Sequence, residues 1–222
     1  MKIIGIIPAR GGSKSIPLKN IKLLNGKPLI EYTIESALLS NVLDRIIVST
    51  DHDDIDAIAK KYNNVEVFRR PAKFSTDQSS SEDALLNVCD QIQERESYIA
   101  DVVFTLEPTS PLRSISTIIR CKEMFENKDV DSVVGVVETN GVYGKVVDNK
   151  YKLLFSEQSR RRQDREALFK ISSTIFATKM STLRNTKDVL GGELYPLIIN
   201  RKEAIDINDE YDFMIAEIIC KM

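Results

Sequence analysis

Short apolar runs rich in β-branched residues alternate along the chain with longer segments in which apolar residues recur every three or four positions. The short runs cover Ile3–Ile7, Arg45–Ser49, Asp101–Leu106 and Asp131–Val137. Runs of this kind are typical of strands that are buried on both faces. The longer segments, which predict amphipathic helices, are 28–39, 53–62, 81–95, 115–126 and 209–220. The alternation predicts a mostly parallel α/β sheet covered by helices, with ligands at the carboxyl ends of its strands.

The stretch 139–172 departs from this rhythm. Two apolar segments, Val142–Val147 and Tyr151–Phe155, flank Asp148-Asn149-Lys150 in the way that two strands flank a hairpin turn. A polar segment rich in arginine follows them. We therefore expect one domain over residues 1–222, with 139–172 as an arm that leaves its core.

Composition narrows the possible partners. The 222 residues are 42% hydrophobic, and 31 basic residues against 33 acidic ones give a formal charge of −2. This balance provides no overall field to attract nucleic acid or a membrane surface. The three cysteines are scattered without metal-binding spacing, and no apolar run suits a signal peptide or a membrane span. We expect a soluble, cytoplasmic protein with reduced thiols.

The basic residues are concentrated in the loop after the first predicted strand. Residues 1–30 hold six cations and no acidic residue, and the loop reads PARGGSKSIPLKN. Its glycine pair, Gly11 and Gly12, would let the backbone approach a ligand and adopt positive φ, so that N–H groups point at phosphate oxygens. Arg10 and Lys19 would add charge. The loop has neither a P-loop nor a dinucleotide motif, so a solvated turn is the alternative at this point.

Several strings, taken in order, resemble one known family. IIPARGGSKSIPLKNI followed by GKPLIEYTIESAL is similar to the amino-terminal signature of cytidylyltransferases that activate sialic acid and related nine-carbon 2-keto sugar acids as CMP-sugars. The resemblance continues in RIIVSTD at 45–51, RRPAKFSTDQSSSEDAL at 69–85, LEPTSPLR at 106–113, RRRQD at 160–164 and AIDINDEYDF at 204–213. It covers nearly the whole chain and implies a three-layer α/β/α sandwich of the Rossmann-like nucleotidyltransferase type.

The resemblance implies that the first loop wraps the triphosphate of CTP. The candidates to bind it are Arg10, Gly11, Gly12, Ser13, Lys19 and Asn20. Cytosine would lie against Arg70, whose guanidinium can donate to the base, and against the loop Ser75–Ser81 with Ser79 and Ser80. The alternatives are a surface ion pair for Arg70 and a helix N-cap for the serines.

The reaction that the resemblance implies is in-line attack by the anomeric hydroxyl of the sugar on the α-phosphorus of CTP, which expels pyrophosphate. Mg²⁺ or Mn²⁺ would neutralise phosphate charge, and the catalytic candidates are Arg10, Lys19 and Asp206. Relatives hold the metal with an Asp-x-Asp pair, whereas this chain has Asn208 at the second position. We expect weaker metal binding, or compensation by Asp209 or another carboxylate. The alternative for Asp206 is a cap of the last helix.

Two positions depart from the family where its members bind the acceptor sugar. Relatives usually carry glutamine at the position of Glu107, and a carboxylate donates no hydrogen bond unless it is protonated. Glu107 would bind a hydroxyl or amino group of the sugar, help to hold the metal, or pair with a neighbouring cation. Ser172 and Ser173 replace an Asn-Gly pair of sialic acid enzymes, which makes Ser172 a candidate for sugar binding.

The arm carries the candidates for the carboxylate of the sugar. Arg161, Arg162 and Gln163 match a basic arm of the family, and arginine suits a carboxylate through two parallel hydrogen bonds. A solvated run of charge is the alternative. A hairpin that leaves the core exposes apolar side chains, and relatives dimerise through this segment. We expect a homodimer whose arm reaches the sugar pocket of the partner.

His52, the only histidine, follows the string STD. We interpret it as a surface residue at the start of a helix, because no Ser or Cys nucleophile motif accompanies it. Two other functions stay open. One is another sugar nucleotidyltransferase, for a deoxy-octulosonate or for mannose 1-phosphate. The other is a nucleotide-binding protein without activity, which Asn208 and Glu107 would explain.

Overall fold

The computed structural model describes residues 1–75, 80–155 and 161–221, but not the side chain of Arg162. A seven-stranded sheet with the strand order β11-β7-β10-β6-β1-β4-β5 forms its centre. The parallel strands are β1 (Ile3–Pro8), β4 (Arg45–Thr50), β5 (Glu66–Arg69), β6 (Val102–Thr105), β7 (Ser132–Thr139) and β11 (Leu194–Ile198). Strand β10 (Leu168–Lys179) runs antiparallel between β6 and β7. The predicted mostly parallel sheet is confirmed.

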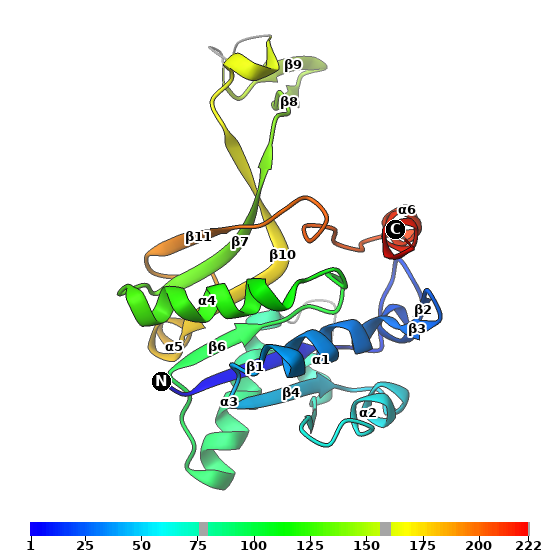
Figure 1. Ribbon diagram of the computed structural model, residues 1–222, viewed down its shortest axis with the longest axis vertical. Helices are drawn as coiled ribbons and strands as arrows, with labels where there is room; N and C mark the ends of the chain where they lie inside the picture. The colour runs from blue at the N-terminus through cyan, green and yellow to red at the C-terminus, as the bar shows by residue number, and fades with distance from the viewer. Residues whose placement is uncertain (76–79, 156–160, 222) are drawn as a thin grey trace.

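Helices cover both faces of the sheet (Figure 1). On one face, Ile3 and Ile7 of β1 pack in a cluster with α1 (Leu29–Ser40), α2 (Asp53–Ala59) and α4 (Ile115–Asn127). On the other face, Ile4 and Ile6 pack with α3 (Ser81–Glu96) and α5 (Met180–Thr186). Successive residues of a strand point to opposite faces, so one apolar strand supplies both clusters. The expected three layers are present.

The predicted elements are confirmed with small shifts at their ends. The largest shift is in α2, which ends at Ala59 instead of residue 62, because Lys61 and Tyr62 donate to carbonyls three residues back and continue as turns. The sequence pattern did not predict β5, β10, β11 and α5. Within the described residues, no helix combines the length and apolar character needed to cross a membrane.

A third apolar cluster joins the first loop to the end of the chain. It packs α6 (Glu210–Cys220) against a short hairpin of β2 (Leu23–Leu24) and β3 (Lys27–Pro28), and it also buries Ile16 of the loop and Ile207. The hairpin turns at Asn25 and Gly26, both with positive φ. The packing brings the segment that holds Asp206 against the first loop, although about 190 residues separate them in sequence.

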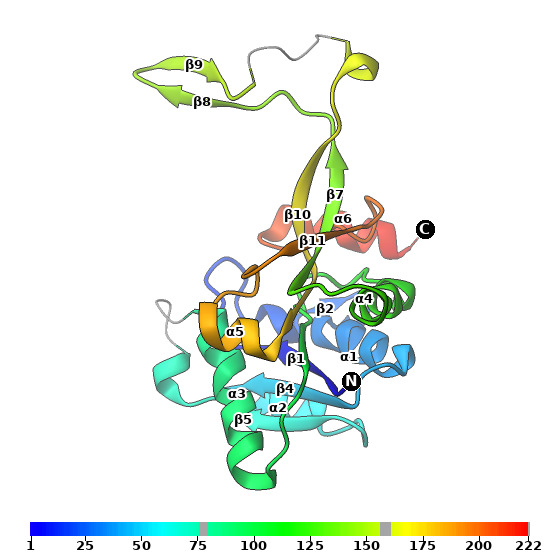
Figure 2. The same ribbon diagram turned by 90° about the vertical axis from the view of Figure 1, so that its left-hand side faces the viewer.

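Within the stretch 139–172, the described residues before 156 and the segment from 161 to the start of β10 project from the body as an arm. Strands β7 and β10 run out of the body toward a hairpin of β8 (Gly144–Val147) and β9 (Lys150–Leu153) (Figures 1 and 2). The hairpin turns at Asp148 and Asn149, which have positive φ. The short helix η3 (Arg162–Asp164) lies at the same end of the arm, far from the carboxyl end of β1 in both views.

Candidate active site

The candidate residues gather at the carboxyl ends of three neighbouring strands. Strand β1 leads into the cation-rich loop, β4 into Asp51 and His52, and β6 into Glu107. Strand β1 lies between β4 and β6. The strands that follow β1 in sequence are therefore added to the sheet on both of its sides. This is a topological switch point, where open α/β sheets place their ligands.

Asp51 and His52 hold the first loop in place. The Gly11 N–H donates to Asp51 Oδ1 at 2.8 Å, and a Cβ on Gly11 would lie 2.6 Å from Cδ2 of His52. Neither Gly11 nor Gly12 has a positive φ, so that expectation was wrong. Glycine is needed at position 11 because His52 packs against its Cα. Nδ1 of His52 accepts from the Asp54 N–H at the start of α2, which confirms the interpretation of His52 as a helix-start residue.

The rest of the loop is fixed by its own polar groups. Asn20 is buried, and its Nδ2 donates to the carbonyl of Arg10 at 2.9 Å. The N–H of Ser13 donates to the carbonyl of Gly11 at 3.0 Å, whereas a Cβ on Gly12 would meet nothing within 4 Å. Asn20 therefore shapes the loop around Arg10, and Gly12 lies at its open side.

Lys19 is the cation that connects this loop to the carboxylates. Its Nζ donates to the carbonyl of Ile207 at 2.8 Å. Burial lowers the pKa of Lys19, while Asp206 and Glu107, the two acids with the strongest influence, act to raise it. The structure thus brings together three sequence candidates, one from each end of the chain and one from its middle.

Arg70 is buried and directly follows β5. Its Nε donates to Ser49 Oγ at 3.2 Å and its second guanidinium nitrogen to the Ser49 carbonyl at 3.0 Å. Burial lowers the pKa of Arg70, with Asp51 opposing that shift. The alternative of a surface ion pair was wrong for Arg70 and describes Arg69, which pairs with Asp53 at 2.7 Å.

Of the two serine candidates, only Ser80 lies among the described residues. It is the N-cap of α3, and its Oγ accepts from the Asp83 N–H at 3.0 Å. The predicted helix cap is confirmed. Ser79 falls outside the described residues.

Asp206 and Asn208 lie on the same side of an extended segment. Asn208 Nδ2 donates to Asp206 Oδ2 at 3.0 Å, and the intervening Ile207 is buried in the third apolar cluster. The second oxygen, Asp206 Oδ1, is buried and has no hydrogen-bond partner within the described part of the chain. The cap of α6 is Asp209 in a capping box with Asp212, so the capping alternative for Asp206 was wrong.

The donor set at this point suits a hard divalent cation. An unpaired buried carboxylate oxygen is a free ligand, and Mg²⁺ commonly takes one or two carboxylates and completes its shell with phosphates and water. The described residues contain no group of three or more His, Cys, Asp or Glu side chains placed to hold a metal. Oδ1 of Asp209 accepts from the Tyr211 and Asp212 N–H groups as the cap of α6, so compensation by Asp209 would have to come from its other oxygen.

Glu107 faces the same space from the end of β6. Desolvation and the neighbouring Asp206 raise the pKa of Glu107 to about 7, against the opposing influence of Arg113 and Lys19. Thr109 Oγ1 lies 3.5 Å from Glu107 Oε2 and is at the limit of a hydrogen bond. Near neutral pH this carboxyl group is therefore present in both its protonated and its ionised form.

The structure gives the two serines of β10 different surroundings. Ser172 is buried, and its Oγ lies 2.7 Å from Thr174 Oγ1. Ser173, which the site prediction omitted, donates to Asp206 Oδ2 at 3.1 Å. The pairing of β10 with β7 shifts register between Ile171 and Phe176, and this irregularity redirects the side chains between them.

The basic residues of the arm lie away from these groups. Arg161 and Gln163 are exposed at the far end of the arm, where η3 begins at Arg162. In Figures 1 and 2 this end projects away from the carboxyl edge of the sheet. The structure of one chain therefore does not bring them to Arg10, Lys19 or Asp206.

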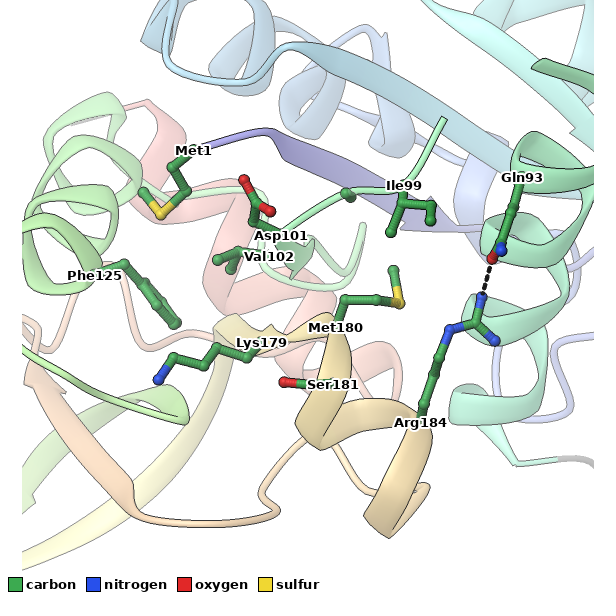
Figure 3. Close-up of a pocket in the computed structure, with 11 residues that line it drawn as sticks. Met1, Gln93, Ile99, Asp101, Val102, Phe125, Lys179, Met180, Ser181 and Arg184 are labelled. Atoms are coloured by element: carbon green, nitrogen blue, oxygen red, sulfur yellow. Dashed lines mark hydrogen bonds between the residues drawn. The ribbon is translucent and has the colours of Figure 1, made fainter. Parts of the chain in front are cut away.

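A cavity of about 560 Å³ lies at the opposite edge of the sheet (Figure 3). Its lining includes Asp101 before β6 and Lys179 at the end of the antiparallel β10. Its cations are paired, Arg184 with Asp90 at 2.8 Å and Lys179 with Asp129 at 2.5 Å. The carboxyl edge remains the candidate site, because α/β sheets bind ligands there.

Sheet order and the position of the site define an open α/β protein whose candidate site lies at the carboxyl ends of its strands. A family model described as Cytidylyltransferase matches residues 4–201. The chain belongs to this family.

Curated relatives carry related names. The chain is 31% identical over 220 residues to an N-acylneuraminate cytidylyltransferase of Escherichia coli O18:K1:H7, with 97% of this chain and 51% of that protein covered. It is 30% identical over 223 residues to a CMP-N,N'-diacetyllegionaminic acid synthase of Legionella pneumophila, with 98% and 95% covered. The chain thus spans about half the length of the Escherichia relative and nearly all of the Legionella relative.

Solved structures share the fold at low identity. A CMP:2-keto-3-deoxy-manno-octonic acid synthetase complexed with CTP superposes with a TM-score of 0.74 at 16% identity, over 100% of this chain and 99% of that chain. A 4-diphosphocytidyl-2C-methyl-D-erythritol synthase gives 0.74 at 13% identity, over 99% and 98%. At these identities the likeness shows the fold alone.

Proposed function

We propose that the chain transfers CMP from CTP to the anomeric hydroxyl of a nine-carbon 2-keto sugar acid and releases pyrophosphate. One observation carries the proposal: Lys19 of the cation-rich loop lies beside Asp206, whose buried oxygen has no partner in the described residues. Cations and a free carboxylate at one switch point suit a triphosphate with its metal. The names of the relatives support the sugar class, since they include sialic and legionaminic acid enzymes.

The chemistry is a displacement at phosphorus. The anomeric oxygen forms a bond to the α-phosphorus of CTP, the bond to the bridging oxygen breaks, pyrophosphate leaves with that electron pair, and the hydroxyl proton passes to a base. No covalent nucleophile is required, so positioning and neutralisation of phosphate charge supply most of the rate. Arg10 and Lys19 would contact phosphate oxygens, and Arg70 would donate to cytosine.

A divalent metal is part of the proposal. Asp206, with the amide oxygen of Asn208 and the carboxylate of Glu107 near it, would hold Mg²⁺ or Mn²⁺, which when bound neutralises phosphate charge. Because Asn208 stands where the family has a second aspartate, we expect this site to need more metal than an Asp-x-Asp site does.

A homodimer is also part of the proposal. The arm exposes Val146 by 73% and Tyr151 by 60%, and a second copy would cover such residues. In a two-fold dimer, Arg161, Arg162 and Gln163 of one arm would reach the sugar carboxylate in the partner's site. We place the enzyme in the cytoplasm, in keeping with the free thiols of Cys89, Cys121 and Cys220.

The test is pyrophosphate release from CTP with a panel of sialic, legionaminic, pseudaminic and deoxy-octulosonic acids. We expect release with at least one nine-carbon acid and with CTP in preference to ATP, GTP and UTP. Release only with the eight-carbon acid would move the chain to the deoxy-octulosonate class. CTP binding without release for any acid would leave a nucleotide-binding protein without this activity.

A further inference from the structure

Two buried charged side chains, Arg113 and Glu203, lie behind the site and have no role in the proposed chemistry. Arg113 is 4% exposed and Glu203 7% exposed. Neither would touch CTP or sugar. Arg113 holds the segment that carries the carboxylate of Glu107, and Glu203 holds the segment that carries the carboxylate of Asp206.

Arg113 fixes the segment of Glu107. Its guanidinium donates to the carbonyl of Glu107 at 2.8 Å and to Thr33 Oγ1 at 3.1 Å, and its Nε donates to the carbonyl of Thr174. A planar fork with three separate acceptors sets both position and direction, which a lysine cannot reproduce. Arg113 therefore ties the end of β6 to α1 and to β10.

Glu203 fixes the segment of Asp206. Its Oε2 accepts from the N–H of Ser114 at 3.2 Å, from Ser114 Oγ at 2.9 Å and from Thr117 Oγ1 at 2.5 Å, all in the first turn of α4. Its Oε1 accepts from Asn200 Nδ2 at 2.5 Å. A carboxylate with four such donors, three of them at the start of a helix, is held firmly, since the end of the helix favours negative charge.

Thr174 joins the two charged residues. Its carbonyl accepts from Arg113, and its Oγ1 donates to the carbonyl of Glu203 at 2.8 Å. The preceding residue, Ser173, donates to Asp206 Oδ2. Three segments distant in sequence thus meet at the irregular stretch of β10, directly behind the two carboxylates.

We propose that Arg113, Thr174 and Glu203 are positioning residues that fix the carboxylate of Asp206 relative to that of Glu107 and so set how strongly a divalent metal and CTP bind together. The inference rests on the proposed metal site. Groups that orient metal ligands from behind commonly change metal affinity by about 10- to 100-fold when they are altered. Asp51 and Asn20 hold the Arg10–Gly11 part of the CTP loop, and neither of these contacts involves the three positioning residues.

The experiment measures CTP binding by calorimetry, without metal in EDTA and with saturating Mn²⁺. The ratio of the two dissociation constants is the coupling between metal and CTP. We expect Glu203→Gln to reduce this ratio about 10-fold while the metal-free dissociation constant stays within about twofold. Glu123→Gln, an exposed acid on the same helix α4, is the matched control and should change neither value.

Thr174→Val and Thr174→Ser provide a second test if Glu203→Gln does not fold. The valine keeps the shape and removes the hydroxyl, so it should reduce the coupling, whereas the serine keeps the hydroxyl and should restore it. Folded Glu203→Gln and Thr174→Val proteins with wild-type coupling would overturn the inference, provided that Asp206→Ala abolishes coupling. Undiminished coupling in Asp206→Ala would instead show that Asp206 does not hold the metal, and the inference would then be wrong as well.

Discussion

The body of the protein and its arm use similar apolar residues in opposite surroundings. In the body, Val103 of β6 is 1% exposed, whereas Val146 of the arm is 73% exposed. The candidate groups at the carboxyl edge, from Arg10 to Asp206, come from distant parts of one chain and already contact one another through Lys19 and Ile207. Arg161 and Gln163 of the arm are exposed and far from that edge. The candidate groups of the body meet within one chain, whereas those of the arm do not reach them.

The largest expected effect comes from a substitution in the body, at Asp206. Asp206→Ala removes the carboxylate whose buried Oδ1 has no hydrogen-bond partner among the described residues, so Mg²⁺-dependent pyrophosphate release should fall by about 1,000-fold or more. Asn208→Asp should act in the opposite direction and lower the Mg²⁺ concentration for half-maximal rate, because it adds a hard anionic ligand. Metal titrations of the initial rate check both. Unchanged metal dependence in both variants would exclude this segment from the site.

The next effect concerns the cation-rich loop. Lys19→Ala should cost about 2–4 kcal/mol of transition-state stabilisation, which is a loss of about 30- to 1,000-fold in kcat/KM, if its charge meets phosphate in a site poor in water. Arg10→Ala should fall in the same range. The matched control is Lys14→Ala, an exposed lysine of the same loop, for which we expect less than about a threefold loss. Near-normal turnover of both Lys19→Ala and Arg10→Ala would refute the phosphate cradle.

A smaller effect is the pH dependence of stability at Glu107. Its pKa is raised from an ordinary 4.5 to about 7 in the folded chain. As pH rises from about 4.5 to 7, the unfolded state loses this proton while the folded state keeps it, so the free energy of unfolding decreases. Glu107→Gln has no such proton. Without metal and CTP, its stability relative to wild type should improve by up to about 3 kcal/mol between pH 4.5 and pH 8.

Urea unfolding at several pH values checks this prediction. The matched control is Glu123→Gln, which removes an exposed carboxylate and should leave the pH dependence of wild type unchanged. If the curves of Glu107→Gln and wild type run parallel from pH 4.5 to pH 8, then the carboxyl group of Glu107 is not desolvated in the folded chain.

The last prediction compares one substitution in the two regions, and the smallest effect is expected in the arm. Val103→Ser opens a cavity and buries a hydroxyl in β6, so it should cost more than about 2 kcal/mol of unfolding free energy. Val146→Ser in the arm should change the unfolding free energy of a chain by less than about 0.5 kcal/mol, but it should raise the dissociation constant of the dimer. Urea unfolding and sedimentation measure the two quantities. A large loss of chain stability in Val146→Ser would mean that the arm packs on its own body.

The sequence pattern predicted the parallel core because its strands are buried on both faces and read as uninterrupted apolar runs. Strand β10 was not predicted, since LFKISSTIFATK mixes exposed residues of the arm with buried residues of the body in one element. Its register shift, which directs Ser173 to Asp206, depends on pairing with β7 and has no local signal. The hairpin of the arm was predicted because Asp-Asn favours the positive φ of its turn.

The sequence motifs predicted which residues belong to the candidate site, but they predicted fewer of the contacts between those residues. Arg10, Lys19 and Asp206 follow from strings that resemble the family, but the contact of Lys19 with Ile207 requires the docking of α6 beside the first loop. Asp51 carried a usable signal, because it follows a buried strand at the switch point. Arg113 and Glu203 carried none, since a sequence does not distinguish a buried charge from a surface one.

The most direct test of the account is complementation between two inactive chains, Arg162→Ala and Lys19→Ala. Mixed and re-equilibrated in equal amounts, they should recover about a quarter of the wild-type rate of pyrophosphate release, because half of the dimers are mixed and each mixed dimer holds one site with an intact loop and an intact arm. No recovery in dimers shown by sedimentation to be mixed would contradict a site shared between the body of one chain and the arm of its partner. A fully active monomer would contradict it as well.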